Sequence, residues 1–329
     1  MVKTKARIIG TGSYLPEHIL NNEDLEKLVD TSDEWIYSRT GIKERRIASY
    51  DEYSSDMGLK AAKAALKIAK KNPTEIDLIL VATISPDYIF PSTAALIQNM
   101  LGAHQAAAFD FQAACTGYLY GLVMAKGFID SGIYRNILLI ASEKLSSFVN
   151  YKDRNTCVLF GDGASASVIS DHGEGYEIME SSLGADGELA QLLILPAGGC
   201  RIPASPDTIA QHQHFIMMEG KEVFKHAVRR MENAAKDCLE RANMHEDEID
   251  WLVPHQANAR IIDAIARRFG VNESKVFKTV HKYGNTSASA VAIAFDELIR
   301  ERTIESGECI LLVAFGAGFT WGATILKKI

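Results

Sequence analysis

Cys115 is the residue whose type and setting could carry nucleophilic chemistry. It lies in the segment DFQAACTGY, residues 110–118, where an apolar run ends and a helical pattern begins after Thr116. A cysteine at a helix N-terminus is expected to have a lowered thiol pKa, because backbone N–H groups and the helix dipole favour the thiolate. The alternative is a buried structural thiol. That alternative is our interpretation of the other four cysteines, Cys157, Cys200, Cys238 and Cys309.

His255 and Asn285 are the polar residues that could act with this cysteine. His255 lies in PHQAN, after an expected strand at 251–253 and at the start of an expected helix at 258–269. This is the carboxyl end of a strand, where open α/β sheets usually carry function. Asn285 lies in YGNTSAS, before an expected helix at 290–302. A hydrogen-bonded histidine and a turn or N-cap asparagine are the alternatives.

The elements that must position these residues are repeated along the chain. LKIAKKNPTEIDLILV, residues 66–81, aligns with LERANMHEDEIDWLV, residues 239–253, at an offset of 173. A Ser-Gly pair precedes NILLIA and CILLVAF in the two halves, at an offset of 175. This pattern predicts a duplicated unit. Asn285 then occupies in the second half roughly the position that Cys115, 170 residues earlier, occupies in the first half. Pseudo-twofold packing of the two halves would bring these two residues near each other.

The periodicity of apolar residues indicates an α/β protein with largely buried sheets. Helical patterns, best seen at 56–70 and 258–269, alternate with short β-rich runs. We expect two halves in one body, residues 1–172 with the cysteine and residues 173–329 with the histidine and asparagine. The Gly- and Pro-containing stretch 173–220 is expected to be an elaborated loop region.

Two glycine clusters, FGDGAS from Phe160 and FGAGFTWG from Phe315, lack the spacing of a dinucleotide or phosphate loop. We interpret both as tight turns, the second aiming backbone N–H groups at a site. No metal site is expected either, because the five cysteines are spaced 42, 43, 38 and 71 residues apart.

Composition excludes several classes of protein. The 329 residues are 47% hydrophobic and 23% charged, with 35 basic against 42 acidic residues and a net charge of -7. A mildly acidic chain is not expected to bind nucleic acid in general. Its apolar runs are too short for a membrane span, and the N-terminus lacks the apolar region of a signal peptide. We therefore expect a cytoplasmic protein.

Taken together, DFQAACTG, VPHQAN, YGNTSAS and FGAGFTWG closely resemble the β-ketoacyl-acyl-carrier-protein synthase III family, the condensing enzymes that start bacterial fatty-acid synthesis. GTGSYLP, TSDEWIYSRTGIKERRIA, FPS and FGDGA extend the resemblance over the whole chain. The resemblance implies a thiolase-like fold, a five-layer αβαβα arrangement of two duplicated halves. It also implies a homodimer, and coenzyme A thioester as substrate rather than cofactor.

The resemblance further implies a role for each motif. Cys115 would attack a short acyl-CoA, expected to be acetyl-CoA, and hold the acyl group until malonyl-acyl carrier protein binds. His255 and Asn285 would hydrogen-bond the malonyl thioester oxygen during decarboxylation. The backbone N–H groups of Cys115 and Ala317 would form the oxyanion hole, and Phe315 would shield the decarboxylation site.

The same resemblance assigns binding residues. Phe90 would reach the partner's acyl pocket and limit primer size, and Lys221 stands where the family is expected to have asparagine. The remaining assignments are coenzyme A contacts at Thr31, Trp35, Arg39 and Arg154, and a basic face for the acidic carrier protein at Lys225, Arg260, Arg267 and Arg268. The alternatives are a core tryptophan at Trp35 and a solvated helix face for the basic residues.

Three other functions stay open from the sequence. A specialised Claisen condensing enzyme of the same fold would take longer or aromatic acyl-CoA. A papain-like hydrolase also uses cysteine, histidine and asparagine, but the sequence around Cys115 does not match that class. A non-enzymatic binding module is the third, and a complete set of three reactive residues argues against it.

Overall fold

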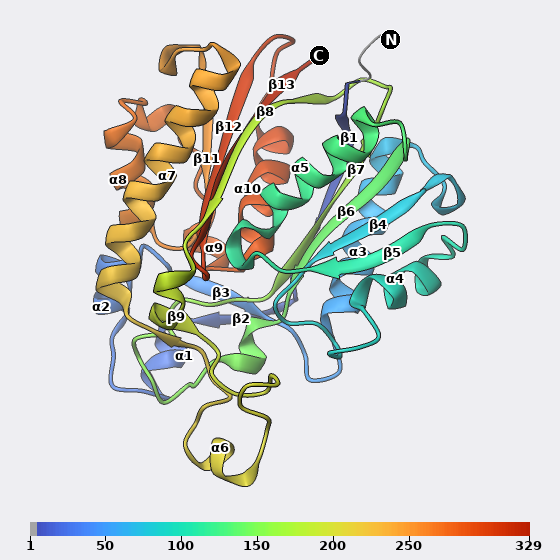
Figure 1. Cartoon of the computed structure of the whole chain (residues 1–329). Helices are drawn as coiled ribbons and strands as arrows, with labels where there is room; N and C mark the ends of the chain where they lie inside the picture. Colours follow the sequence, from blue (N-terminus) through green and yellow to red (C-terminus); the bar gives the residue numbers. More distant parts are fainter. Residues whose placement is uncertain (1–4) are drawn as a thin grey trace.

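The computed structural model describes residues 5–329, and its centre is a nine-stranded mixed sheet (Figure 1). The strand order is β11-β12-β13-β8-β1-β7-β6-β4-β5. These strands are β1 (Arg7–Tyr14), β4 (Leu78–Ala82), β5 (Ala107–Phe111), β6 (Asn136–Glu143), β7 (Gly163–Ser170), β8 (Tyr176–Ala185), β11 (Trp251–Pro254), β12 (Cys309–Gly316) and β13 (Thr320–Lys328). The short strands β2 (His18–Asn21) and β3 (Glu44–Ile47) pair with each other, as do β9 (Leu193–Ile194) and β10 (Met217–Met218).

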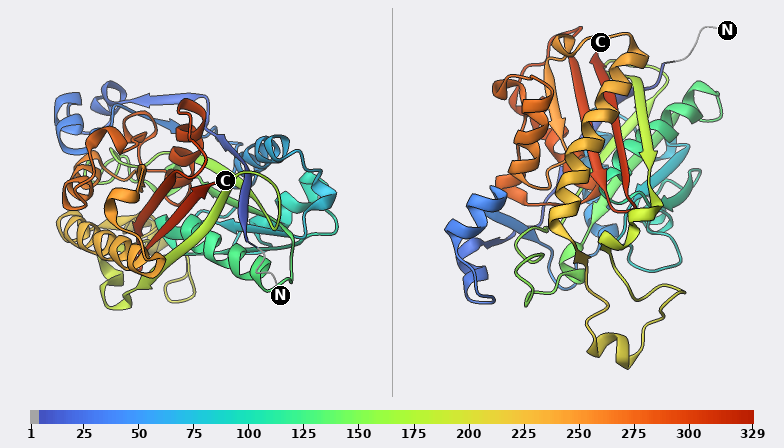
Figure 2. Two further views of the ribbon diagram at one scale, coloured as in Figure 1. Left: turned by 90° about the horizontal axis from the view of Figure 1, so that it is seen from above. Right: turned by 60° about the vertical axis from the view of Figure 1, so that its left-hand side comes forward.

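The sheet has two wings, β11-β12-β13-β8 and β1-β7-β6-β4-β5, and helices lie on both sides of each wing (Figures 1 and 2). The longer ones are α3 (Ser54–Ala69), α4 (Thr93–Leu101), α5 (Gly117–Asp130), α7 (Gly220–Ala242), α8 (Ala259–Arg268) and α10 (Ala288–Glu301). The shorter ones are α1 (Asn22–Glu26), α2 (Asp33–Thr40), α6 (Pro206–Ala210) and α9 (Val280–Tyr283). No helix within residues 5–329 is both long enough and apolar enough to cross a membrane.

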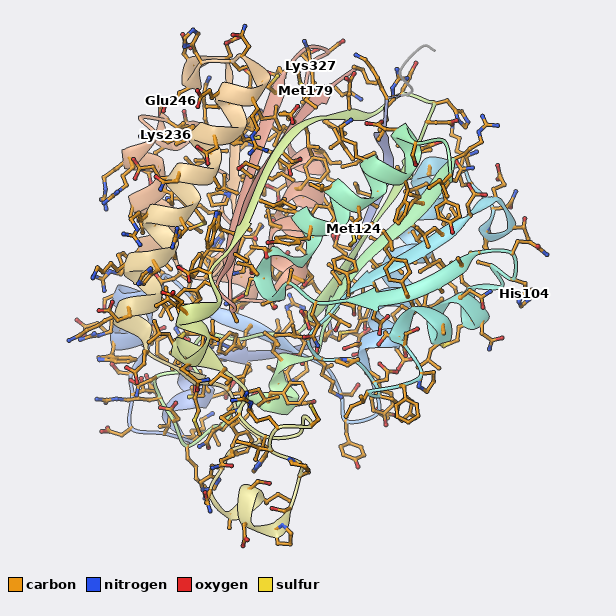
Figure 3. All side chains as sticks on the ribbon, in the orientation of Figure 1. His104, Met124, Met179, Lys236, Glu246 and Lys327 are labelled. Carbon is orange, nitrogen blue, oxygen red and sulfur yellow. The ribbon has the colours of Figure 1, made fainter. Side chains whose placement is uncertain are left out.

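The five layers follow from the alternation of side chains along the buried strands. In β6, Ile137 and Leu139 pack with residues of α5 and α10, whereas Leu138 packs with residues of α3. In β12, Leu312 faces the same central pair of helices, and Leu311 faces α7 and α8. The order is thus helix, sheet, central helices, sheet, helix, which confirms the predicted αβαβα architecture. Figure 3 shows side chains filling these layers, including Met124 of α5.

The duplication predicted from sequence is present in the topology. β4 and β6 are parallel and β6 and β7 antiparallel, and β11, β12 and β13 repeat this arrangement. The two wings meet where β1 pairs with β8 through only two residue pairs, Arg7 with Glu177 and Ile8 with Tyr176. The division at residues 172 and 173 falls between β7 and β8, and it stays a prediction.

Two expectations about local structure are wrong. The stretch 173–220 is not all loop, because Tyr176–Ala185 forms the ten-residue strand β8 of the central sheet. The later part of the stretch, around α6, does leave the body of the protein (Figure 1). In FGDGAS, Phe160 forms a bridge with Asn285 and Gly163 begins β7, so this cluster is extended chain rather than a tight turn.

Candidate active site

One cavity of about 270 Å³ lies between the two halves and brings the three predicted reactive residues together. Cys115 from the first half and His255 and Asn285 from the second line it, together with Phe315 and Gly316. Much of the remaining wall is apolar and includes Val158, Leu159, Leu193, Met218, Val223, Phe224, Ala227, Met231 and Ile261. Sequence reasoning missed the wall from α7, although Val223, Ala227 and Met231 recur at the four-residue spacing of one helix face.

Cys115 is fixed by a short 3₁₀ turn, Ala114–Thr116, that leads directly into α5. Ala114 has φ of 45°, a left-handed conformation that is uncommon for a residue with a side chain. The Thr116 hydroxyl donates to the Ala113 carbonyl at 2.5 Å, and its oxygen lies within hydrogen-bond distance of the Thr320 hydroxyl, at 2.8 Å. Cys115 therefore sits at the expected helix N-terminus, held from both halves of the chain.

The expected lowering of the thiol pKa is wrong in this structure. Burial raises the pKa of Cys115 to about 12, while the neighbouring Ser287 hydroxyl opposes the rise and the Glu143 carboxylate adds to it. The physical reason is one of magnitude. A helix dipole contributes about 0.3–1 kcal/mol, whereas full burial shifts a pKa by up to about 3–5 units.

His255 lies directly beyond β11, where its backbone N–H donates to the Val313 carbonyl at 2.7 Å. Burial lowers the pKa of its imidazole to about 3, so the ring is neutral at physiological pH. Its Nδ1 atom is buried without a partner in residues 5–329. Gln256 holds the adjacent loop, because its Oε1 accepts from the backbone N–H groups of Thr279 and Val280. Sequence reasoning did not single out Gln256.

Asn285 is anchored on both sides of its peptide. Its N–H donates to the Leu159 carbonyl at 2.8 Å, and its own carbonyl accepts from Gly161 at 3.0 Å. Its side-chain Oδ1 accepts from the Ser287 N–H at 2.9 Å. The acceptor end of the amide is thus engaged, which leaves the NH₂ group as the free donor. A neutral imidazole and an amide therefore present hydrogen-bond donors without a positive charge.

The turn after β12 closes the cavity next to Cys115. A Cβ on Gly316 would lie 2.7 Å from the Cys115 nitrogen, so only glycine allows this approach. Phe315 is buried and packs on Phe319 with ring centroids 4.7 Å apart. The Ala317 carbonyl accepts a hydrogen bond from the Thr320 hydroxyl. The backbone N–H of Ala317 has no acceptor in the part of the chain described. The predicted turn at FGAGFTWG is confirmed.

Trp35 marks the solvent-facing end of the cavity. The guanidinium carbons of Arg39 and Arg154 lie 4.9 and 5.1 Å from its ring centroid. Trp35 and Arg39 line the cavity, whereas Thr31 and Arg154 do not. Arg154 donates to the Asp30 carbonyl at 3.0 Å, beside that opening.

The predicted basic face is exposed on α7 and α8, which pack side by side (Figure 2). Arg260 and Arg267 are exposed and have no ion-pair partner among the described residues. Arg268 is paired with Glu232 at 2.6 Å, and Lys225 lies 3.6 Å from Glu222. Lys221 is exposed in the first turn of α7, next to Gly220 at the cavity wall.

Phe90 lies outside the cavity of its own chain. It is 84% exposed and follows Tyr88 and Ile89, which are 61% and 85% exposed. Strand β5 is one of the two edge strands of the central sheet, and its Phe109 is 39% exposed.

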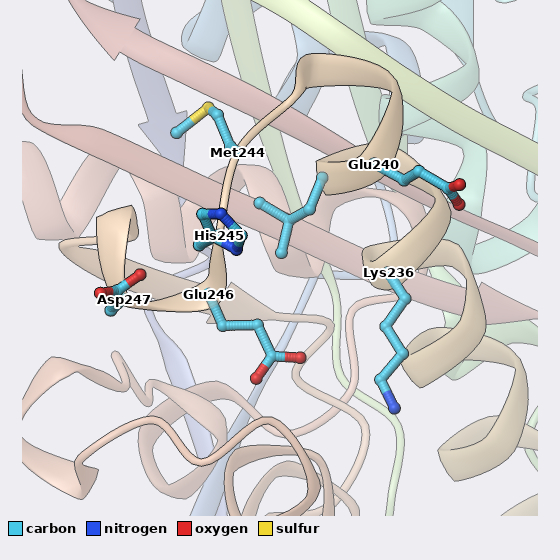
Figure 4. Close-up of a pocket in the computed structure, with 7 residues that line it drawn as sticks. Lys236, Glu240, Met244, His245, Glu246 and Asp247 are labelled. Carbon is cyan, nitrogen blue, oxygen red and sulfur yellow. The ribbon is translucent and has the colours of Figure 1, made fainter.

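A second depression lies at the end of α7, away from the reactive residues (Figure 4). It is lined by charged side chains such as Lys236, Glu240 and Asp247. Lys236 is engaged with Glu232 at 2.9 Å. None of the three reactive residues contributes to it.

A duplicated αβαβα chain with cysteine, histidine and asparagine at one buried cavity has the architecture of a thiolase-like condensing enzyme. Residues 109–187 match the family described as 3-oxoacyl-[acyl-carrier-protein] synthase III, and residues 239–328 match its C-terminal part. The chain belongs to this family.

Relatives support this assignment over the full length. A beta-ketoacyl-[acyl-carrier-protein] synthase III of Chlamydia caviae is 63% identical over 326 residues, covering 99% of this chain and 97% of the relative. The protein of that name from Caldanaerobacter subterraneus subsp. tengcongensis is 54% identical over 325 residues, covering 99% and 98%. The crystal structure of 3-oxoacyl-[acyl-carrier-protein] synthase III from Aquifex aeolicus has a TM-score of 0.91 and 47% identity, covering 98% and 99%.

Proposed function

We propose that this chain catalyses the decarboxylating condensation of a short acyl-CoA with malonyl-acyl carrier protein, the step that starts fatty-acid synthesis. The products are 3-oxoacyl-acyl carrier protein, CO₂ and coenzyme A. The observation that carries the proposal is that Cys115, His255 and Asn285, from two halves of a chain of this family, line one cavity. Membership of the family supports the reaction, and the residue roles below are our assignments.

Acylation comes first. The Cys115 sulfur attacks the thioester carbonyl of acyl-CoA and forms an acyl-Cys intermediate as coenzyme A leaves. The backbone N–H groups of Cys115 and Ala317 stabilise the oxyanion of the tetrahedral intermediate. The unpaired Ala317 N–H and the close contact of Gly316 with Cys115 support this assignment.

Condensation follows when malonyl-acyl carrier protein enters. His255 and Asn285 donate to the malonyl thioester oxygen, where negative charge builds as CO₂ is lost. A neutral histidine suits this role, because decarboxylation itself generates the carbanion and no proton is abstracted. The apolar ring of Phe315 shields the carbanion from water until it attacks the acyl-Cys carbonyl.

Substrate binding uses both ends of the site. The purine of coenzyme A stacks at Trp35 with the guanidinium groups of Arg39 and Arg154, and Thr31 lies nearby. Arg260 and Arg267 attract the acidic carrier protein, with Lys225 at the rim. Arg268 contributes less to this attraction because Glu232 already neutralises it.

We also assign the active form to a homodimer. Strand β5 has an unpaired sheet edge and carries Phe109, which is 39% exposed, and natural proteins cover such edges. A second copy packed there isologously would carry Phe90 toward the partner's acyl pocket. Phe90 would then restrict the primer, which favours acetyl-CoA. The five cysteines are free in the structure, and we assign the protein to the reducing cytoplasm.

Intact-protein mass spectrometry tests the proposal. Incubation with a series of acyl-CoAs should give one acyl adduct at Cys115 from acetyl-CoA, discharged only when malonyl-acyl carrier protein is added. Cys115→Ser should form no thioester adduct. Asn285→Ala should form the adduct and fail to discharge it.

Other outcomes would redirect the assignment. Adducts only from longer or aromatic acyl-CoAs would indicate a specialised Claisen enzyme. Release of free acid without malonyl-acyl carrier protein would indicate a hydrolase. The absence of any adduct would refute the proposed reaction.

A further inference from the structure

A fully buried carboxyl group lies near Cys115 and has no role in the steps assigned above. Glu143 is the last residue of β6 and has no exposed surface. Burial raises its pKa to about 7, although hydrogen bonds from Ser85, Ile84, Ser287 and Thr83 oppose this rise. A buried acid that titrates near neutrality next to a reactive thiol calls for a physical explanation.

The hydrogen bonds of Glu143 are distributed unevenly between its two oxygens. Oε2 accepts from the Ser85 hydroxyl at 2.6 Å, the Ile84 N–H at 3.1 Å and the Thr83 hydroxyl at 3.2 Å. Oε1 is buried without a full hydrogen bond in residues 5–329. Most buried side-chain polar atoms have a hydrogen-bond partner, so the unpaired Oε1 calls for an explanation. One oxygen is thus fixed by the fold, and the other is left available.

Ser287 is a neighbour of both the Glu143 carboxyl group and the Cys115 thiol. Its hydroxyl is next to both the Glu143 carboxyl and the Cys115 thiol, and it lowers the pKa of each. Its Oγ reaches full hydrogen-bond geometry with neither group and is itself buried without a partner. The backbone of Ser287 has φ of 52° and is tied to Asn285 Oδ1. This unusual conformation at the start of α10 is what places the hydroxyl there.

We propose that Glu143 exchanges a proton with the Cys115 thiol through the Ser287 hydroxyl. Glu143 touches no substrate in this scheme and is a positioning residue that sets the protonation state of the nucleophile. The inference deepens the proposed function and rests on it for the two half-reactions.

The proton transfers balance over the catalytic cycle. As the Cys115 sulfur bonds to the acyl carbon, its proton passes to Ser287 while the Ser287 proton passes to Glu143 Oε1. The carbon–sulfur bond to coenzyme A breaks, and the departing thiolate takes a proton from water. In condensation the enolate attacks the acyl-Cys, the carbon–sulfur bond to Cys115 breaks, and Glu143 returns the proton through Ser287. The resting thiol and carboxylate are restored.

The pair explains how a buried thiol can react near neutral pH. Near pH 7 the Cys115–Glu143 pair loses the Glu143 proton, while the Cys115 thiol keeps its own proton up to high pH, so the carboxylate is available as a base while the thiol is still protonated. His255, neutral and with a pKa of about 3, does not supply a base strong enough for this transfer. The other groups that contact Glu143, from residues 83–85 and Ser287, are uncharged hydroxyl and backbone groups.

The test follows alkylation of Cys115 by iodoacetamide from pH 5 to 9.5, located by peptide mapping, which requires no acyl substrate. For the unmodified chain the rate should rise to about pH 7 and then stay level, because the thiol reacts as its proton moves to the Glu143 carboxylate, and the ionised fraction of Glu143 is complete above that pH. In Glu143→Gln the plateau should disappear, and the rate should rise about tenfold per pH unit as for an isolated thiol. Ser287→Ala should behave in the same way, and Glu143→Asp should retain the plateau.

Acylation by acetyl-CoA is measured on the same variants. Glu143→Gln should slow adduct formation at pH 7 by roughly 10²-fold, the usual lower contribution of a positioned acid–base group. Glutamine keeps an acceptor for Ser85, Ile84 and Thr83, so a structural role alone predicts little change. Asp162→Asn is the matched control, because Asp162 is an equally buried carboxyl bonded to Ser146 and Ala48. It should keep the plateau.

Failure of this inference is distinct from failure of the proposed function. If the unmodified chain and Glu143→Gln have the same pH profile of alkylation, the proton exchange is refuted, whether or not acyl-CoA acylates Cys115. If the alkylation profiles differ as expected but no acyl-CoA modifies Cys115, the proposed reaction fails while the Cys115–Glu143 pair stands.

Discussion

Replacement of Gly316 by alanine tests whether close approach of β12 to the nucleophile positions it. The added Cβ would lie 2.7 Å from the Cys115 nitrogen and 3.2 Å from its Cβ. Ordinary contacts begin at 3.4 Å, so the two backbones must separate by about 0.7 Å. β12 cannot retreat easily, because it is paired with β11 on one side and β13 on the other. Cys115 must therefore move.

A displacement of this size should cost about 10²-fold in rate, since a misplacement near 1 Å has that effect on reacting groups. The assay is the rate of acyl-Cys formation from acetyl-CoA, measured by intact-protein mass spectrometry, with thermal unfolding recorded alongside. Gly127→Ala in α5 is the control, because nothing lies within 4 Å of its Cβ position and alanine favours a helix. Acylation of Gly316→Ala within threefold of the unmodified rate would refute the reasoning.

Four further predictions address binding, assembly and pH. Trp35→Ala should raise the Michaelis constant for acetyl-CoA about tenfold, because base stacking on an aromatic ring contributes about 1–3 kcal/mol. An equal rise in the Michaelis constant for malonyl-acyl carrier protein would argue against stacking of the coenzyme A purine on Trp35. Arg260→Ala should raise the Michaelis constant for malonyl-acyl carrier protein by about fivefold, because an exposed charge contributes up to about 1 kcal/mol. If the Michaelis constant of Arg260→Ala equals that of the unmodified chain at every salt concentration, docking at this face is contradicted. Phe109→Lys should convert a dimer into monomers in light scattering, because a charge would be buried at the β5 edge, and a dimer of unchanged affinity would exclude that interface. Burial lowers the pKa of His255 to about 3, against 6.5 in the unfolded chain. Only the unfolded chain takes up this proton as the pH falls, so stability decreases with a slope that approaches about 1.4 kcal/mol per pH unit well below pH 6.5. Urea unfolding at pH 6.5 and pH 5 should therefore show a loss of stability about 1.7 kcal/mol smaller in His255→Asn than in the unmodified chain.

The convergence of the site could be predicted because it depends on order along the chain. The repeat placed Cys115 and Asn285 at equivalent positions before two central helices, and both now line one cavity. His255 was placed by the end of a strand, which the structure confirms. These features follow from the periodicity of apolar residues and from the order of strands and helices along the chain, both of which can be determined from the sequence alone.

Features that depend on contacts between distant segments could not be predicted. The thiol pKa of Cys115 is set by burial from several elements, which outweighs the local helix terminus. Arg268 looks free in sequence, yet Glu232 lies 36 residues earlier and faces it from α7. Strand β8 was missed because YEIMESSLGA has many polar residues and weak alternation, and its pairing with β13 makes it a strand.

The seam between the two wings of the sheet has a consequence for how this chain could diversify. Only two residue pairs join β1 to β8, while each wing carries its own helices and packs its own outer core. The outer cores of the two wings can therefore accept substitutions independently, whereas the core around α5 and α10 contains residues of both wings and couples them. Cys115 and Asn285 precede the central helices of the two similar units, so one unit carries the proposed nucleophile and the other carries a proposed hydrogen-bond donor.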